Sequence, residues 1–196
     1  MGWVKGRWQL IVLLAIFILP TVAAMVMVFS DWRPGTFTNN GDLVQPPVQL
    51  EPGQWQAVEG AAPTLAGDWL VVMPQMQACG EACLQRLDKL NRVRVALDRD
   101  IERVRLIVLQ PQDQLEPVVE PAAGILNLAA PAAIVERLAV HDGEPIAAQV
   151  VDYRGYQVMR YPVPLDASGL LDDLEKLLRL AKEEAERRAL EEATAQ

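Results

Sequence analysis

An uncharged apolar run near the N-terminus constrains this chain more than any other feature. The run WQLIVLLAIFILPTVAAMVMVF, residues 8–29, is 22 residues long and contains no Asp, Glu, Lys or Arg. As an α-helix it would be about 33 Å long, enough to cross the roughly 30 Å hydrocarbon core of a bilayer. The run predicts a single transmembrane helix over residues 8–29, preceded by a short segment of residues 1–7.

The charges before this run predict its orientation. Lys5 and Arg7 precede the span, and positive residues stay on the cytoplasmic side of a membrane. We therefore expect residues 1–7 in the cytoplasm and everything after the span in the periplasm, with the protein in the inner membrane. The alternative is a cleaved signal peptide, whose apolar core is usually only about 7–15 residues long. Under either interpretation the remaining chain lies where disulfides persist.

The segment after the span is typical of a linker. Residues 30–63 are rich in Pro, Gly and Asn and have no helical period, so we interpret them as an extracytoplasmic tether. Two pieces of it, VQL (48–50) and WQAV (55–58), could be short edge strands. We expect the folded domain at residues 64–182 and a charged, solvated helix end at residues 183–196.

The start of this domain predicts a β-α-β unit. The run GDWLVVM (67–73) is short, apolar and rich in Val, as in a buried strand. Residues 80–100 repeat apolar side chains every three or four positions, as in a helix packed on one face. VRLIVLQ (104–110) predicts a second buried strand, parallel to the first.

The rest of the domain predicts further elements in a recognisable order. Residues 111–131 contain several prolines and predict irregular structure, and residues 131–140 a short helix. Residues 146–162 predict a hairpin that turns at DYRG. Asp166 and Ser168 can cap a final helix. The order indicates the α/β class and a thioredoxin-like domain, in which the first strand's end and the next helix form the reactive corner.

Cys79 and Cys83 fall at this corner and are the only cysteines in the chain. Thiolates are stabilised at a helix N-terminus by the helix dipole and free N–H groups. The four-residue spacing places both sulfurs on one helical face. A structural disulfide, a redox pair and a pair of metal ligands are all compatible with it. In a redox role, we expect Cys79 to attack and Cys83 to resolve the intermediate.

A soft metal ion is the third possibility at this corner. Cu(I) favours thiolate and thioether ligands, with imidazole as a further one. Met76 lies in the loop before Cys79 and could supply a thioether, and His141 is the only histidine, in a polar loop. The candidate metal ligands are therefore Cys79, Cys83, Met76 and His141. Met73 is expected to pack in the core as the end of the first strand.

Several classes of function are disfavoured by the sequence. The formal net charge is −8 and no basic stripe is present, which argues against binding nucleic acid. The sequence has no phosphate-binding loop, paired zinc motif or dinucleotide fingerprint. A Ser-His-Asp set cannot be assembled from it.

The stretch from GDWLVVMPQMQACGEAC to VRLIVL resembles the core of the SCO/SenC family. That family consists of membrane-anchored, thioredoxin-like proteins that help to assemble the copper centre of cytochrome c oxidase. The resemblance includes a strand, a CxxxC motif, a helix, a basic run and a second strand, and VVDYRGYQVMRYP looks like the family's late hairpin. The sequence has Gly80 where the family usually has Pro, and the register of the family's copper-binding histidine falls on Glu144.

This resemblance implies a membrane-anchored assembly factor for a respiratory cytochrome c oxidase. It would deliver Cu(I) or exchange disulfides at Cys79 and Cys83, and its partners would be an oxidase subunit or other assembly proteins. A metallochaperone or assembly factor is favoured over an enzyme. Two alternatives stay open: a general periplasmic thiol–disulfide oxidoreductase, and a non-catalytic scaffold with a degenerate thioredoxin-like fold.

Overall fold

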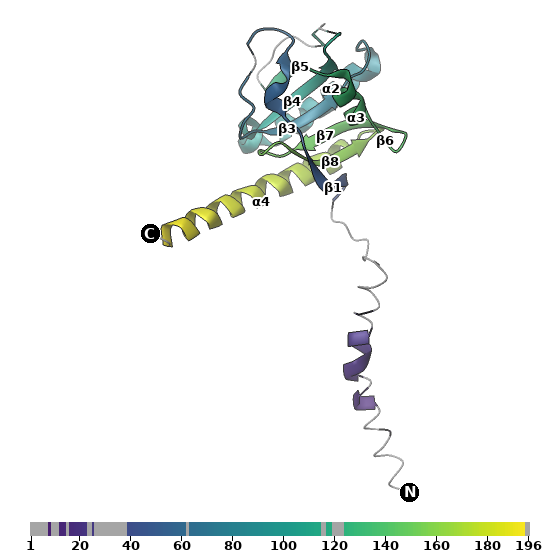
Figure 1. The fold of residues 1–196 in the computed structure, drawn as a ribbon, viewed down its shortest axis with the longest axis vertical. Helices are drawn as coiled ribbons and strands as arrows, with labels where there is room; N and C mark the ends of the chain where they lie inside the picture. The colour runs from purple at the N-terminus through teal and green to yellow at the C-terminus, as the bar shows by residue number, and fades with distance from the viewer. Residues whose placement is uncertain are drawn as a thin grey trace. The chain divides into compact units, whose positions relative to one another are not determined.

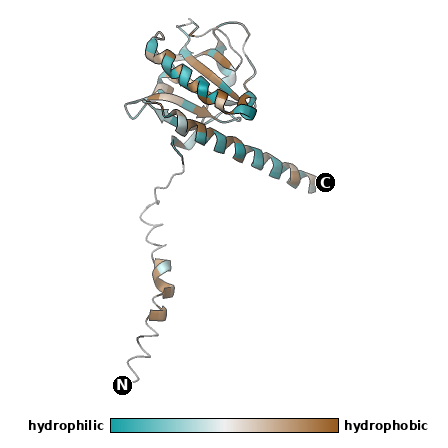
Figure 2. Ribbon diagram, turned by 180° about the vertical axis from the view of Figure 1, so that it is seen from behind, coloured by the Kyte–Doolittle hydropathy of each residue, from teal (hydrophilic) through white to brown (hydrophobic). Residues whose placement is uncertain are grey.

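The computed structural model describes residues 8, 12–14, 16–22, 25, 39–61, 63–114, 117–118 and 124–194. The chain divides into two compact units, Met1–Thr38 and Asn39–Gln196. In the first unit the described residues are helical and exposed, and Figure 2 colours them mostly hydrophobic. Within the described ranges, no helix combines the length and the apolar character that crossing a membrane requires. The predicted N-terminal segment, residues 1–7, lies outside the described residues.

The second unit is built on one mixed β-sheet (Figure 1). Its strands, in the part of the chain that the structure describes, are β1 (Asp42–Gln49), β2 (Gln56–Ala57), β3 (Trp69–Pro74), β4 (Val104–Pro111), β5 (Ile125–Ala130), β6 (Val140–His141), β7 (Glu144–Val151) and β8 (Tyr156–Pro162). The order across the sheet is β1-β8-β7-β3-β4-β5-β2, and β6 pairs with β7. β3, β4 and β5 are parallel, and β7 runs antiparallel to β3.

Helices cover both faces of this sheet. The helices of the second unit are α2 (Glu81–Ala96), α3 (Ala132–Ala139) and α4 (Ala167–Thr194), with 3-10 turns η1 (Pro52–Gln54) and η2 (Asp98–Arg103). Alternate residues of a strand point to opposite faces. Val71 and Met73 of β3 accordingly pack in the core under α2 and α4. Leu70 and Val72 pack in the core on the α3 side.

Most of the predicted elements are confirmed. The β3-α2-β4 unit is parallel in register from Trp69 opposite Val104. The late hairpin is β7 and β8, the short helix is α3, and the final helix is α4. Met73 is fully buried, as expected of a core residue. Figure 2 shows α4 extending beyond the sheet with a mostly hydrophilic far half, and most residues of that half are exposed.

The predicted irregular stretch at residues 111–131 is wrong in its last part. Residues 125–130 form β5, a strand that pairs in parallel with β4 from Leu106 opposite Ile125. The prolines that favoured a loop lie outside this strand. Only a short alternation of side chains gives β5 one face in the core: Leu128 and Ala130 pack on the α3 side.

The predicted boundary between tether and domain is also corrected. β1 pairs with β8 and β2 pairs with β5, so residues from Asn39 onward belong to the folded unit. Leu50 and Trp55 are buried in the core on the α3 side. The segment looks like a linker in sequence partly because of Pro46 and Pro47. Both lie in the edge strand β1, where proline is tolerated because an N–H need not be shared with a neighbouring strand.

Candidate functional site

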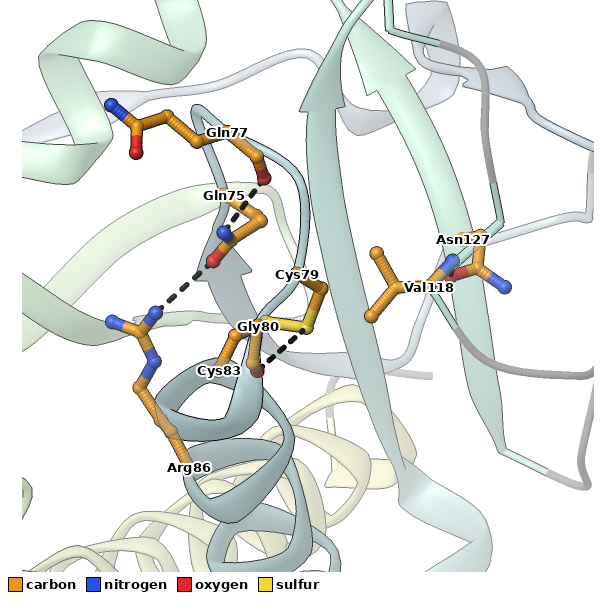
Figure 3. Close-up of a disulfide and its surroundings, with 8 residues drawn as sticks. All are labelled: Gln75, Gln77, Cys79, Gly80, Cys83, Arg86, Val118 and Asn127. Atoms are coloured by element: carbon orange, nitrogen blue, oxygen red, sulfur yellow. Dashed lines mark hydrogen bonds between the residues drawn. A yellow bond between two sulfur atoms is a disulfide. The ribbon is translucent and has the colours of Figure 1, made fainter.

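A disulfide joins Cys79 to Cys83 at the end of the loop that follows β3 (Figure 3). The two Cα atoms are 5.3 Å apart, within the usual range for a bridge. The sequence leaves open a structural disulfide, a redox pair and a pair of metal ligands. In the structure the two cysteines are bridged. A bridged pair is compatible both with a structural staple and with the oxidised form of a redox pair.

The bridge lies at the N-terminus of α2. Gly80 is the N-cap residue in an extended conformation, and Leu84 N donates to its carbonyl oxygen at 3.1 Å. Cys83 is in the first turn of the helix, whereas Cys79 precedes the cap. The position at the helix N-terminus is thus as predicted, but the sulfurs do not share one helical face. After reduction, free N–H groups and the helix dipole favour a thiolate here.

The two sulfurs differ in exposure. Cys83 is 5% exposed and packs in the core under α2 and α4. Cys79 is partly buried and packs against the same core from its rim. A partner can therefore reach Cys79 more easily than Cys83. The predicted order, in which Cys79 attacks and Cys83 resolves, fits this difference.

A groove of about 870 Å³ opens beside Cys79. One side is the loop after β3, with Gln77 and Ala78, and the other side is the end of β4 and the turn after it, with Asp113 and Gln114. Figure 3 shows Val118, which also lines the groove, with its side chain on the disulfide side. The N–H of Val118 donates to Oδ1 of Asn127 at 3.1 Å, which fixes this wall to β5.

Hydrogen bonds fix the loop that carries Cys79. Gln75 N donates to Leu109 O at 2.9 Å, which extends the parallel pairing of β3 and β4 past Pro74. Gln75 Nε2 donates to Gln77 O at 2.8 Å. From the neighbouring helix, Arg86 Nη2 donates to Gln75 Oε1 at 3.1 Å. Figure 3 shows the two contacts of the Gln75 side chain on the other side of the bridge from Val118.

Arg86 occupies a costly position. Its Nε is buried and has no hydrogen-bond partner among the described residues. Burial lowers the pKa of Arg86 from its ordinary value, although an arginine stays cationic in proteins. An unpaired buried donor destabilises a fold, so the position of Arg86 calls for an explanation.

Met76 is not brought to the cysteines. It packs against the core on the α3 side of the sheet, whereas both cysteines pack on the α2 and α4 side. The alternation along β3 already indicates this, because Leu70 and Val72 face the α3 side and Met76 has the same parity. The described geometry therefore gives no support to a thioether ligand from Met76.

His141 lies at the end of the short strand β6, opposite Glu144 of β7. Its Nε2 is 3.2 Å from Oδ2 of Asp142. In the described parts of the chain, no three or more His, Cys, Asp or Glu side chains gather as metal ligands. His141 therefore does not complete a three-residue metal group with Cys79 and Cys83 here, and its role as a ligand stays a prediction.

Sequence reasoning missed three contributors to this corner. Gln75 and Arg86 carry no motif, since their contact joins residues 11 positions apart through side chains alone. Val118 lies in the stretch predicted as irregular. The only available signal was the helical spacing of Cys83 and Arg86, which places them one turn apart on α2.

Two family models match the chain. The model described as "Transmembrane-like, thioredoxin-like, C-terminal domain" matches residues 69–181, more than half of the chain. The model described as "Transmembrane-like, N-terminal domain" matches residues 4–31, around the predicted span. No curated protein matches the chain.

Solved structures are similar to this chain at low sequence identity. A SCO1/SenC family lipoprotein from Bacillus anthracis is 14% identical with a TM-score of 0.50, and the match covers 69% of this chain and 99% of the lipoprotein. Yeast Sco1, solved with copper bound, is 17% identical with a TM-score of 0.49, covering 71% of this chain and 92% of Sco1. The thioredoxin domain of a thiol-disulfide oxidoreductase from Bacteroides vulgatus is 16% identical with a TM-score of 0.40, covering 58% of this chain and 81% of that domain. The predicted thioredoxin-like fold and resemblance to SCO/SenC structures are confirmed.

Proposed function

The chain belongs to the family of transmembrane-like, thioredoxin-like proteins, and from this premise we propose that it is a membrane-anchored thiol–disulfide exchange protein. It acts on the extracytoplasmic side of the inner membrane during assembly of a respiratory cytochrome c oxidase. The match of the N-terminal family model to residues 4–31 and the uncharged run at residues 8–29 support the anchor.

One observation carries this proposal. The chain's two cysteines are bridged at a helix N-terminus, with Cys83 buried and Cys79 reachable from a groove. A bridge across four residues closes so short a loop that its entropic stabilisation of the fold is small. A purely structural bridge would also have no need of a groove beside one sulfur. The asymmetry is what an attacking and a resolving cysteine require.

The exchange proceeds in two balanced steps. In the reduced protein the thiolate of Cys79 attacks one sulfur of a partner disulfide, and a mixed disulfide forms as the partner's other sulfur leaves as a thiolate. The thiolate of Cys83 then attacks Sγ of Cys79, and the partner's second sulfur leaves. Two electrons pass from the cysteine pair to the partner disulfide. An external dithiol restores the reduced pair.

Oxidase assembly gives this chemistry a substrate. Cysteines that bind copper in an oxidase subunit must be reduced before the metal enters, because the thiolate is the ligand. The resemblance of the motif region to the SCO/SenC family supports this choice of partner. A general periplasmic oxidoreductase would use the same two cysteines on a wider set of partners.

Cu(I) delivery is the second candidate function, with the ion as cargo. The reduced pair offers two soft thiolates on adjacent backbone segments, the donor type that Cu(I) prefers. The described residues add no group of three or more ligands, so a partner would complete the coordination. His141 and Met76 are not needed in this scheme. The third possibility, a scaffold, would use the surface of the fold and neither cysteine.

Trapping of a mixed disulfide tests the exchange function. Reduced full-length protein in detergent micelles is incubated with a peptide disulfide. We expect Cys83→Ser to accumulate a stable mixed disulfide through Cys79, because no resolving thiolate remains. Cys79→Ser should accumulate far less, because Cys83 is buried. Equal trapping by both variants, or by neither, would contradict the proposal.

A copper titration of the same samples separates the two candidates. One-to-one Cu(I) binding against a competing chelator, lost in Cys83→Ser, would favour delivery of the ion. Exchange without such binding would leave thiol chemistry as the function. If Cys79→Ser leaves oxidase assembly intact in cells, the scaffold is the remaining account.

A further inference from the structure

A chain of hydrogen bonds runs alongside the disulfide and joins the same two segments. We call it the Arg86 brace: Arg86 Nη2 donates to Gln75 Oε1, and Gln75 Nε2 donates to Gln77 O. Arg86 is on α2, three residues after Cys83, and Gln77 is in the loop, two residues before Cys79. Figure 3 shows the brace and the bridge as two separate links between helix and loop.

The brace is built from groups that are costly to place there. Gln75 is 9% exposed, and Nε of Arg86 is buried with no hydrogen-bond partner in the part of the chain that the structure describes. Buried polar groups are nearly always satisfied in native proteins, so an exception requires a compensating role. An aliphatic side chain at position 86 would avoid this cost. The position is therefore better explained by the contact with Gln75 than by the packing of α2.

We propose that Arg86 is a positioning residue that stabilises the Cys79–Cys83 disulfide relative to the dithiol. The inference rests on the proposed exchange function, because it concerns the redox balance of the same pair. When the bridge is open, the brace still holds the loop against the helix. The two thiols then stay close, and less conformational entropy is lost when the bond forms again.

The direction of the effect follows from this geometry. Without the brace, the loop between Pro74 and Gly80 gains freedom in the reduced protein and the effective concentration of the two thiols falls. The bridge then becomes easier to reduce. A direct electrostatic role of the cation would act in the opposite direction, because a positive charge near a thiolate stabilises the reduced form. The sign of the change therefore distinguishes the two roles.

The experiment measures the equilibrium between disulfide and dithiol in the full chain. Protein in detergent micelles is equilibrated with mixtures of reduced and oxidised dithiothreitol, and free thiols are counted after alkylation. We expect Arg86→Met to lower the equilibrium constant for disulfide formation about tenfold, equivalent to about 30 mV for a two-electron couple. Arg86→Lys keeps the charge and a donor nitrogen and should recover part of the loss.

Arg92→Met is the matched control on the same helix. Arg92 is exposed and pairs with Asp88 one turn earlier, so its removal should leave the equilibrium unchanged. Gln75→Met removes the middle of the brace without a change of charge and should reproduce the effect of Arg86→Met. It also keeps the test valid if Arg86→Met does not fold, as judged by circular dichroism.

Two results would overturn the inference. One is an equilibrium constant for Arg86→Met equal to that for Arg92→Met. Where Arg86→Met does not fold, the same comparison is made with Gln75→Met. The other is a more stable bridge in Arg86→Met, which would indicate a direct effect of the charge. Failure of the proposed function is seen separately, in the trapping experiment with Cys83→Ser. The redox equilibrium is defined whether or not a partner is trapped.

Discussion

Arg94 is a buried arginine whose side chain binds the main chain at the start of β4. It is 6% exposed, and its Nε donates to Val104 O at 2.9 Å. Burial is the main cause that lowers the pKa of Arg94. The guanidinium also leaves no space next to Gly124, where an added Cβ would lie 1.9 Å from Nη2. Gly124 begins the turn into β5 with a φ of +78°, so both backbone and space require glycine.

Substitution of Gly124 tests this packing. Gly124→Ala should lower the free energy of unfolding by about 2–4 kcal/mol, from left-handed backbone strain and overpacking against Arg94. Gly143→Ala is the control, because Gly143 has a φ of +82° but open space around it. It should cost only about 1 kcal/mol, from the backbone alone. Chemical denaturation measures both, and equal losses would show that the contact with Arg94 is unimportant.

At the scale of elements, the first turn of α4 is fixed by a single carboxylate. Asp166 Oδ1 accepts from Gly169 N at 3.0 Å and from Ser168 Oγ at 2.8 Å. These hydrogen bonds lower the pKa of Asp166, and the one from Gly169 N has the largest effect. The predicted capping role of Asp166 is confirmed, whereas Ser168 lies inside the helix and donates to the cap.

The cap predicts a pH-dependent loss of stability. Asp166→Ala should lower the melting temperature at pH 7 by about 2–4 °C, because a helix cap is lost. The folded pKa of Asp166 lies below its unfolded value of about 3.9, so its stabilisation is present above that pH and disappears as the pH falls through the folded pKa. The gap between variant and wild type should therefore close below about pH 4.

Asp172→Ala is the control for this experiment, because Asp172 is exposed on the same helix. It should leave the melting temperature nearly unchanged at pH 7. Thermal unfolding followed by circular dichroism between pH 3 and pH 7 gives both curves. A gap for Asp166→Ala that stays constant down to pH 3 would contradict a role for the ionised carboxylate.

Elements with strong periodicity could be predicted from the sequence, and those without it could not. β3 and β4 are continuous apolar runs, and α2 repeats its buried residues Cys83, Leu87 and Leu90 with helical spacing. β5 follows a proline-rich stretch, and Asn127 interrupts its apolar run. The site follows the same rule. The place of Cys79 and Cys83 at a strand-to-helix corner was predictable, whereas the Arg86 brace depends on side chains that no local pattern connects.

At the scale of the whole molecule, the beginning of the folded unit is tied to its last helix. The N–H groups of Asn40 and Gly41 each donate to Asp173 Oδ2 at 2.9 Å. Tyr161 OH donates to the same oxygen at 2.9 Å. Burial is the main cause that raises the pKa of Tyr161, and this hydrogen bond is the second. The segment that contains Asn40 and Gly41 has the composition of a tether. Its N–H groups nevertheless bind the buried carboxylate of Asp173, so the segment is part of the folded unit.

This arrangement predicts where the folded unit can be cut. A fragment of residues 39–196 should unfold cooperatively, whereas a fragment of residues 64–196 should have no cooperative transition or a much lower melting temperature. The shorter fragment lacks the buried side chains of Val44, Leu50 and Trp55. At about 2 kcal/mol each, these contribute about 6 kcal/mol of a total stability that is typically about 5–15 kcal/mol.

A third fragment shows whether the loss is specific to this segment. Residues 39–182 lack the largely exposed end of α4, so this fragment should melt within a few degrees of residues 39–196. Thermal unfolding by circular dichroism, with the disulfide intact in all samples, compares the three. If the fragment of residues 64–196 is as stable as the other two, β1 and β2 are accessory to the fold and the tether extends to Pro63. If it alone is unstable, the segment before β3 is part of the core, because Leu50 and Trp55 pack on the face opposite α2 and α4.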